Sequence, residues 1–436
     1  MAVRAGRDAP LTGNPWTWRR VAFVMFAVAW GANQFSPMLI VYRHELGLNP
    51  GMIAGLFGIY AAALVPGLLL GGPASDRFGR RPVVIPFAVI SPVATLLLVL
   101  APHSLAVIIP GRALGGLCSG VVFGAATAWV QELSADPGVS ARRSAVALSA
   151  GFGLGPLAAG LLAQWTADPL VLPYLPHLLI GVLAVALVLP APETVERNGA
   201  AARPGIAGAP PGRGTRWPPR AVRTARFWLA VAPAAPWVFG CTALAFAVLP
   251  EEVTSASSVS AAFAGMVTAL ALGMGIVAQP VARRIEARRR LAGTVAGLGC
   301  AAAGSALAIA AVGAASEPLA LVCSAVFGLG YGSSLASGLQ EVERLAGRDE
   351  HGAVVAIYYV LTYLGFAAPY LVDWLNPVFG KAATFAVLAA AAAAVAVWTA
   401  GYMAASRRAG PEAGGSERPG GRPASGLAFT RRQDGG

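Results

Sequence analysis

The chain has 436 residues, of which 56% are hydrophobic and only 12% are charged, and its formal net charge is +12. Soluble globular proteins carry roughly 25% charged residues, so this composition excludes a soluble protein and predicts an integral membrane protein. We attribute the positive charge to the position of the arginines relative to the bilayer, and we expect no nucleic-acid partner.

Apolar stretches long enough to cross a lipid bilayer recur along the whole chain, since a helical span needs about 20 residues. The first stretch is too long for the core of a signal peptide and lacks a clear cleavage site, so we expect a retained span. The twelve predicted spans are 21–42, 52–72, 82–101, 105–131, 144–164, 171–190, 227–249, 259–281, 292–313, 318–340, 353–375 and 382–404.

The basic residues alternate between the two sides of these spans. With the N-terminus in the cytoplasm, 29 of the 32 Lys and Arg residues fall in cytoplasmic segments. Only Arg43 and Lys381 fall on the other side, and Arg112 lies within a span. The positive-inside rule therefore predicts a multi-pass protein of the cell (inner or plasma) membrane with both termini in the cytoplasm.

The spans divide six and six. We expect a cytoplasmic N-terminus (1–20), a first six-helix half (21–191), a cytoplasmic linker (192–226), a second six-helix half (227–405) and a disordered cytoplasmic tail (406–436). The linker and tail are rich in Pro, Gly and Arg, which is typical of flexible segments.

The two halves show a weak internal repeat. Residues 279–289 weakly repeat residues 72–81, with Arg283 at the place of Asp76 and Glu286 at that of Gly79. Two halves with degenerate repetition indicate a secondary transporter whose substrate binds near the midplane.

The first span contains polar side chains on one helical face. Trp30 lies three residues before Asn33 and four before Gln34, so the three share a face. Amides in hydrocarbon face the bundle interior or a cavity. We therefore take Trp30, Asn33 and Gln34 as candidates for the substrate cavity, with hydrogen bonding between helices as the alternative for the two amides.

A short charged segment, Gly72-Pro-Ala-Ser-Asp-Arg-Phe-Gly-Arg-Arg81, joins the second and third spans. It resembles the signature G-x-x-x-D-[RK]-x-G-[RK]-[RK] of the major facilitator superfamily. The matching residues are Gly72, Asp76, Arg77, Gly79, Arg80 and Arg81. With the twelve spans and the long central loop, the similarity covers about residues 20–405.

The resemblance implies the all-α major facilitator fold, with two pseudo-symmetric halves of six helices, and transport by alternating access. It also implies that the matched segment gates the cycle. Asp76 would hold the N-terminus of a facing second-half helix, expected to be the eleventh span, in the outward-open state, and Gly79 would permit the tight turn. The alternative is that the arginines of the segment only fix topology.

Two further segments resemble family motifs. Arg112-Ala-Leu-Gly-Gly116 resembles R-x-x-Q-G, which is associated with proton-coupled members, although Gly115 replaces the Gln. The alternative is an arginine that snorkels to the interface.

In the fifth span, Gly151-Phe-Gly-Leu-Gly-Pro-Leu-Ala-Ala-Gly160 resembles the antiporter motif G-x-x-x-G-P-x-x-G-G. Its matching residues are Gly151, Gly155, Pro156 and Gly160. The motif marks exporters, and an ordinary small-residue packing face is the alternative. Pro192-Glu193-Thr194 also looks like a family segment.

Proton coupling needs a titratable group. Many exporters that the chain resembles place an acid in the first span, where this chain has amides. The coupling candidates are Arg112 and Glu132, with Asp76 and His177 as further possibilities. Glu132 has pairing with Arg142 or Arg143 as its alternative, and a packing role is the alternative for His177.

In the second half, Trp237 lies in the seventh span, and Tyr359 and Tyr363 share a face of the eleventh. We take all three as candidates for the substrate cavity, because aromatic rings with few polar groups suit an amphipathic organic molecule.

We therefore expect an exporter of a small drug-like or metabolite compound, working as a monomer in the lipid bilayer with protons as the coupling ion, and no cofactor or metal. The alternatives are an importer or symporter of a metabolite, and a non-transporting receptor on the same scaffold. The sequence has no P-loop for nucleotides and no cluster of catalytic side chains, so we expect no enzyme.

Overall fold

The computed structural model of the chain describes residues 16–134, 137–195, 219–253, 260–346 and 350–408, and every regular element in these ranges is a helix. Most of the predicted linker and nearly all of the predicted tail lie outside the described residues. The first group of helices comprises α1 (Thr17–Asn33), α2 (Phe35–Leu46), α3 (Pro50–Phe78), α4 (Arg80–Leu100), α5 (Leu105–Glu132), α6 (Pro137–Trp165), the 3₁₀-helix η1 (Leu172–Tyr174) and α7 (Leu175–Val188).

The second group follows residue 219 and contains several short pieces. It comprises the 3₁₀-helix η2 (Ala221–Arg223), the π-helix η3 (Phe227–Val231), α8 (Pro236–Ala243), the π-helix η4 (Leu244–Val248), α9 (Leu249–Val253), α10 (Ala261–Arg288), α11 (Ala292–Gly313), α12 (Glu317–Leu345), α13 (His351–Tyr363), the 3₁₀-helix η5 (Leu364–Ala367), α14 (Ala368–Phe379) and α15 (Lys381–Arg408).

The described ranges contain ten helices that are long and apolar enough to cross a membrane, with α1 and α2 counted together. The two other predicted spans are also helical but differ in form. The sixth is shorter, at Leu172–Val188, and the eleventh is divided into α13, η5 and α14. This division falls beside Pro369, which has no N–H to continue the preceding helix. The all-α membrane fold predicted from the sequence is thus confirmed.

Two other predicted spans are interrupted. The first is broken at Gln34, where α1 ends and α2 begins. The seventh passes through two π-helical stretches on either side of α8, and a proline in its middle, Pro236, begins α8. The predicted charged loop 72–81 also needs correction, because α3 continues to Phe78 and leaves Gly79 as the single residue between α3 and α4.

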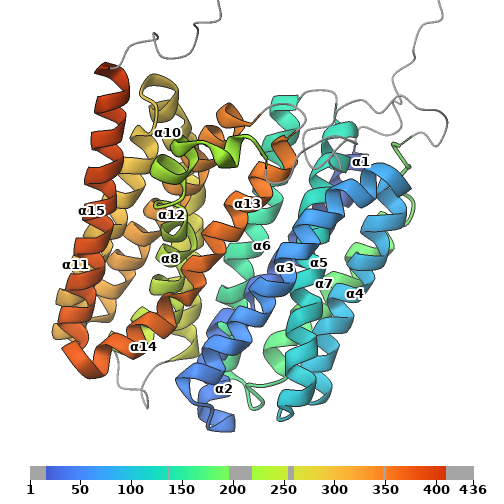
Figure 1. The fold of residues 1–436 in the computed structure, drawn as a ribbon. Coiled ribbons are helices and arrows are strands. Elements are labelled where there is room, and N and C mark those ends of the chain that lie inside the picture. Colours follow the sequence, from blue (N-terminus) through green and yellow to red (C-terminus); the bar gives the residue numbers. More distant parts are fainter. Residues whose placement is uncertain (1–15, 135–136, 196–218, 254–259, 347–349, 409–436) are drawn as a thin grey trace, which may run out of the picture.

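The two groups lie side by side, with the first group (blue to green) on the right of Figure 1 and most of the second group (yellow-green to red) on the left. We call the end of the bundle where α3 meets α4 and α10 meets α11 the arginine end, and the other the opposite end. At the arginine end each group has its own apolar core, around Trp129 in the first group and around Phe227 in the second.

At the opposite end one apolar core spans both groups. It includes Phe35, Tyr42 and Phe57 of the first group and Leu244 and Phe246 of the second. The rings of Phe57 and Phe246 lie 5.4 Å apart, centroid to centroid. The two groups are therefore joined at the opposite end and have separate cores at the arginine end.

Candidate functional site

The first cluster of candidate residues lies at the arginine end of the first group. Arg80 is only 5% exposed, and its guanidinium contacts two carboxylates. Its Nη1 lies 2.6 Å from Asp76 Oδ1, and its Nη2 lies 2.6 Å from Glu132 Oε1. Nη1 also donates to Ser75 Oγ at 2.5 Å. A buried arginine needs such partners to offset its desolvation, and Asp76, Arg80 and Glu132 therefore act as one unit.

Glu193 completes this unit from a distant part of the chain. Its Oε1 accepts a hydrogen bond from the backbone N–H of Arg80 at 2.8 Å, and its Oε2 accepts one from that of Arg81 at 2.9 Å. The carboxylate thus caps the N-terminus of α4, where the helix dipole favours negative charge. We call Asp76, Arg80, Glu132 and Glu193 the first clasp.

The acidity of Glu193 follows from these bonds. Partial burial raises the pKa of its carboxyl group, but four backbone N–H groups, two of them from Arg80 and Arg81, lower it more, so the pKa of Glu193 lies below its ordinary value. Gly79 leaves room for the cap, because a Cβ atom there would lie 2.6 Å from Glu193 Oε2. Gly79 also has a φ of 103°, which a residue with a side chain rarely adopts.

The remaining residues of the matched segment have more peripheral positions. Gly72 is buried, and its carbonyl accepts a hydrogen bond from Ser75 Oγ at 2.8 Å. Arg77 is exposed, and its guanidinium carbon lies 5.2 Å from the ring centroid of Phe78. Arg81 donates from Nη2 to the Leu189 carbonyl at 2.7 Å.

The partner expected for Glu132 was wrong. Its carboxylate pairs with Arg80, whereas Arg143 donates to Ser134 Oγ at 2.9 Å and lies over the ring of Trp18. Asp76 pairs with Arg80 of its own segment. Within the described ranges, no hydrogen bond or ion pair joins Asp76 to the second group.

A second clasp occupies the equivalent place in the second group. The fully buried carboxylate of Glu341 on α12 accepts from Arg226 Nε at 2.9 Å and from Arg290 Nε at 2.8 Å. Glu286, also buried, accepts from the backbone N–H of Leu291 at 2.6 Å and from that of Gly293 at 3.2 Å, and so caps α11 as Glu193 caps α4.

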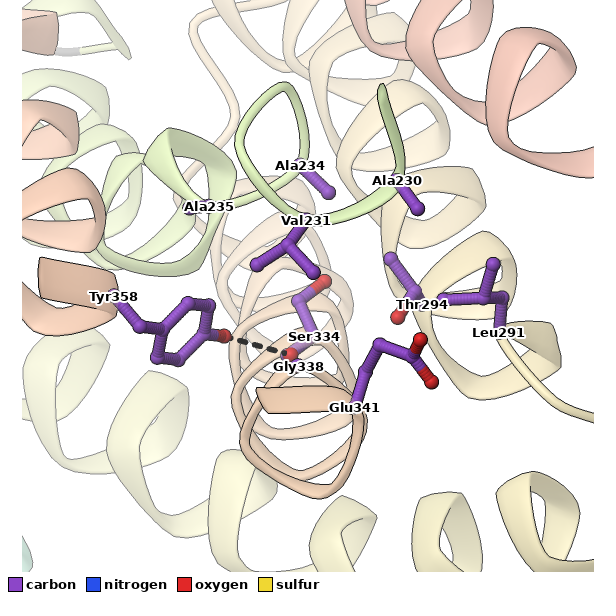
Figure 2. Close-up of a pocket in the computed structure, with 10 residues that line it drawn as sticks. All are labelled: Ala230, Val231, Ala234, Ala235, Leu291, Thr294, Ser334, Gly338, Glu341 and Tyr358. Carbon is purple, nitrogen blue, oxygen red and sulfur yellow. Dashed lines mark hydrogen bonds between the residues drawn. The ribbon is translucent and has the colours of Figure 1, made fainter. Parts of the chain in front are cut away.

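Leu291 has a φ of 63° at the start of α11, where Gly79 has a φ of 103° at the start of α4. Glu286, which stands at the place of Gly79 in the sequence repeat, supplies the carboxylate cap of the second clasp. Figure 2 shows Glu341 beside a small cavity that Thr294 and Ser334 also line. Tyr358 of α13 donates there to the Ser334 carbonyl at 3.3 Å.

Arg112 does not snorkel to the interface. It is 4% exposed, its guanidinium carbon lies 4.0 Å from the ring centroid of Phe35 and 4.5 Å from that of Tyr60, and its Nε donates to the Leu56 carbonyl at 3.3 Å. Within the described ranges no carboxylate pairs with Arg112, so aromatic faces and a backbone carbonyl stabilise its charge.

The glycines of the fifth span face two different helices. A Cβ atom at Gly151 would lie 2.4 Å from the Phe26 carbonyl oxygen, and one at Gly155 would lie 2.6 Å from that of Trp30, so both glycines pack against α1. A Cβ atom at Gly160 would lie 2.4 Å from the Ala261 carbonyl oxygen and 3.0 Å from Gly265 Cα, on α10 of the second group. The carbonyl oxygen of Pro156 lies against Gly265 in turn. The segment thus packs α6 on α1 and joins the two groups.

The candidates for the substrate cavity form two sets, one in the second group of helices and one in the first span. The set in the second group contains Trp237, Tyr359 and Tyr363. Tyr363 stacks on Phe239 with ring centroids 4.7 Å apart and an interplanar angle of 13°, and it packs against Tyr60 of the first group. The centroid of Tyr359 lies 6.4 Å from that of Tyr363. Trp237 is half-buried and packs against the apolar core that spans both groups.

Sequence reasoning missed other members of this aromatic cluster. Phe366 lies 4.9 Å from Phe239 and 4.6 Å from Phe57, centroid to centroid, and Phe239 lies 5.9 Å from Tyr331. Phe239 follows Trp237 by two residues, but ring stacking across helices leaves no signal in a single sequence.

In the first span, the three residues predicted to share a face, Trp30, Asn33 and Gln34, have different surroundings in the structure. Trp30 packs edge-on against Phe26 at 5.8 Å, and its Nε1 is buried without a hydrogen-bond partner. Asn33 is half-buried. Gln34 is 1% exposed, and its Nε2 donates to Thr95 Oγ1 of α4 at 3.2 Å, so the alternative of bonding between helices holds for Gln34.

Comparisons with known proteins agree with this architecture. The family model described as Major Facilitator Superfamily matches residues 21–369. The inner membrane transport protein YnfM of Escherichia coli (strain K12) is 39% identical over 62 residues, which are 14% of this chain and 15% of that relative's length.

Among solved structures, a POT family transporter in complex with 5-aminolevulinic acid is similar with a TM-score of 0.71 and 13% identity, over 91% of this chain and 97% of that one. A mutant of the nucleoside transporter NupG is similar with a TM-score of 0.66 and 11% identity, over 88% of this chain and 99% of that one. At such identities the likeness concerns the fold.

Proposed function

The chain belongs to the major facilitator superfamily of membrane transporters, and from that premise we propose that it exports a small organic compound by alternating access in exchange for protons. The observation that carries the proposal is the unequal joining of the two groups. They share one apolar core at the opposite end and have separate cores at the arginine end. This is the arrangement of an alternating-access transporter that is closed on one side.

An ion pair crosses the closed end. Arg43 Nη1 of α2 contacts Glu251 Oε2 of α9, and Tyr370 of α14 donates to the Gly51 carbonyl at 3.3 Å. We place the arginine end in the cytoplasm on the positive-inside rule, in the cell membrane, with both termini inside and with residues 21–191 and 227–405 as the two halves. On that orientation we infer that this is the inward-facing state, in which an exporter would load its substrate.

Export is supported by the position of the antiporter-like segment. Gly160 lies where α6 crosses α10, the crossing that joins the two groups. Residues in close backbone contact at such a crossing set how the groups move relative to each other. Asp76 would act in the opposite phase of the cycle, when the arginine end closes and a facing helix N-terminus comes within reach.

The substrate proposed is an amphipathic organic molecule. The cluster of Phe239, Tyr331, Tyr363 and Phe366 supplies ring faces and two hydroxyl groups but no charge. Sites of this kind bind apolar and aromatic ligands and use a few polar groups to orient them. Trp30, Asn33, Trp237 and Tyr359 remain proposed contributors, and Arg112 remains the proposed cationic partner in coupling. The transporter would work as a monomer.

Comparing cells that lack the chain with cells that express it tests the proposal. Mass spectrometry of small molecules inside and outside the cells should show at least one compound that accumulates inside the deletion strain. A protonophore should produce the same accumulation in expressing cells. A compound that falls inside the deletion strain supports the importer instead, and unchanged levels of all compounds support a receptor.

A further inference from the structure

His177 lies at the centre of a buried chain of hydrogen bonds in the first group. The side chain comes from α7 and is 1% exposed. Its Nδ1 lies 2.8 Å from Thr95 Oγ1 of α4, and the same hydroxyl accepts from Gln34 Nε2 at 3.2 Å. The chain Gln34–Thr95–His177 thus connects three spans.

The polarity of this chain follows from its donors. The amide of Gln34 donates to the Thr95 hydroxyl, so the hydroxyl proton is left for His177 Nδ1. The imidazole is then neutral, with its own proton on Nε2. Nε2 faces Gly31 and the backbone of Ala27 on α1, and it makes no hydrogen bond of good geometry with the described residues.

One acceptor in the chain is unused. Gln34 Oε1 is buried and has no hydrogen-bond partner, and an unsatisfied buried acceptor costs about 1–3 kcal/mol. Protonation of His177 would use it. The Nδ1–H of the imidazolium would donate to Thr95, the Thr95 hydroxyl would turn toward Gln34, and a flip of the amide would present Oε1 to accept it. The hydrogen-bond chain then reverses its direction with one added proton, and the Gln34 amide exchanges an unpaired Oε1 for an Nε2 that no longer donates to Thr95.

We propose that His177 is the proton-binding site that couples transport, with Thr95 and Gln34 as its positioning residues. The inference rests on the proposed exchange for protons, but it assigns the exchange to a residue outside the segments that resemble family motifs. An antiporter in the inward-facing state has released its proton. The donors and acceptors of the hydrogen-bond chain Gln34–Thr95–His177 in this structure are those expected for a neutral imidazole.

Few charges face this site. α1, α4 and η1 are the main elements packed against α7. The charged residues of α1 end at Arg20 and those of α4 at Arg81, both far along their helices, and α7 has none. In η1, Tyr174 donates to the Tyr42 hydroxyl at 3.1 Å. Among the described residues no counter-charge stabilises an imidazolium in this state. The proposal therefore requires that the other state stabilise the imidazolium better, in which case proton binding shifts the equilibrium toward that state by linkage.

Gln34 connects the site to the closed end. It occupies the break between α1 and α2, and α2 continues to Arg43, which pairs with Glu251 of the second group. A change in the side chain of Gln34 therefore occurs where α1 meets α2, and α2 carries the ion pair at the opposite end.

Proton binding can be measured without a transport substrate. The chain has four histidines, so replacing His44, His103 and His351 with Gln leaves one imidazole for nitrogen NMR of the full chain in lipid nanodiscs. Between about pH 8 and about pH 3 we expect it to change from the Nε2–H tautomer to the imidazolium, because a buried imidazole without a counter-charge is protonated only at acidic pH.

The variants Thr95→Val and Gln34→Leu should each lower the midpoint of this titration by about one pH unit or more. Thr95→Val removes the acceptor of the imidazolium Nδ1–H, and Gln34→Leu removes the acceptor that the Thr95 hydroxyl needs once it has turned away from His177. Thr127→Val in α5 is the control, because its hydroxyl donates to the Phe123 carbonyl of its own helix at 2.6 Å, and it should leave the midpoint unchanged. A resonance that stays neutral throughout, or equal midpoints in all variants, overturns the proposal.

A distance measurement then tests whether protonation of His177 opens the closed opposite end. Spin labels on cysteines placed at Glu45 and Phe379, both exposed at the opposite end, should move apart as the pH falls. His177→Asn, which retains a group that can bond to Thr95 but does not titrate, should abolish this response. A response that persists in His177→Asn overturns the assignment.

The two proposals can fail separately. If the imidazole titrates and its protonation changes the distance between the labels at Glu45 and Phe379, while a protonophore leaves export unchanged, the antiport proposal fails and the proton site stands. If a protonophore stops export and the imidazole stays neutral, the site fails and antiport stands.

Discussion

Gly79 satisfies two demands at one position. Its φ of 103° lets the chain turn within a single residue between α3 and α4, and its missing side chain leaves room for Glu193. Any Cβ atom there meets a carboxylate that is itself held by backbone N–H groups. The first clasp therefore depends on a glycine at this position for both backbone and contact reasons.

Replacing Gly79 by Ala should destabilise the protein by about 1–3 kcal/mol, from the left-handed backbone and the displaced carboxylate together. The thermal midpoint in detergent measures this loss. Gly58→Ala in α3 is the matched control, because a Cβ atom there meets no atom within 4 Å, and it should be neutral or slightly stabilising. Equal effects of the two variants would contradict the role given to Glu193.

Glu193 gives this clasp a pH dependence. Because the folded-state pKa of Glu193 lies below its ordinary value, its contribution is complete above the ordinary pKa and is lost as the pH falls through the folded-state pKa. Melting curves measured toward acidic pH should show a loss of stability that is smaller in Glu193→Gln. A variant whose melting midpoint falls with pH as steeply as that of the wild type would show that the cap contributes nothing.

The sequence allowed part of this clasp to be predicted. Gly72, Asp76, Gly79 and Arg80 form a local pattern that indicates a turn with charges. Glu132 and Glu193 reach Arg80 across separations of 52 and 113 residues, and nothing local distinguishes Arg80 from Arg143 as the partner of Glu132. The packing of α5 against α4 makes that choice.

At the scale of elements, the crossing of α6 and α10 is a close backbone contact between the two groups. Gly160 and Gly265 bring the two backbones together, with no side chain between them. Close contact of this kind maximises dispersion and excludes lipid. The fifth span was predicted correctly as a helix, and the small-residue packing face was the alternative offered for its glycines. The sequence does not specify that Gly151 and Gly155 face α1 while Gly160 faces α10.

Gly160→Ala should weaken this crossing, since its Cβ atom would meet a carbonyl oxygen that cannot turn aside. Overpacking costs about 1–3 kcal/mol, so export should fall by about fivefold or more, as measured by efflux from loaded cells. Gly153→Ala in the same helix is the control, because open space surrounds Gly153. Export reduced equally by both variants would indicate a general effect on α6 and no special role for the crossing.

The broken elements were the least predictable. Prolines in the seventh and eleventh predicted spans are visible in the sequence, but they do not say whether a helix kinks, changes to a π-helix or divides. Gly365 of η5 lies so close to α8 that a Cβ atom there would be 2.1 Å from the Pro236 carbonyl oxygen. This close packing between η5 and α8 depends on a residue of another span, which the sequence around Gly365 does not indicate.

For the molecule as a whole, different ion pairs belong to different states. The pair between Arg43 and Glu251 joins the two groups in this structure. Among the described residues Asp76 pairs with Arg80 of its own clasp, and its proposed role belongs to the state in which the arginine end closes. Under the proposed alternation, the two sets of charges would not be engaged together.

Asp76→Asn and Glu251→Gln should therefore shift the equilibrium between the inward-facing and outward-facing states in opposite directions. Asp76→Asn should favour the inward-facing state, and Glu251→Gln should favour the outward-facing state. Asp76→Asn should reduce export while barely changing stability in detergent, because a partly exposed ion pair contributes about 0–1 kcal/mol and Arg80 keeps Glu132. Labels at Glu45 and Phe379 should stay close in Asp76→Asn and separate in Glu251→Gln. The double variant should give an intermediate distribution. Normal export by Asp76→Asn would exclude Asp76 from the gate.

The position of the contact between Gly160 and Gly265 also has a mechanical consequence. Gly160 lies about 8 Å along α6 from Trp165 at the opposite end but about 35 Å from Pro137 at the arginine end. A fulcrum so far off centre makes a lever with one short arm and one long arm. A rotation that barely parts Arg43 from Glu251 would sweep the arginine end through several times that distance, so the two mouths of the transporter would differ in width.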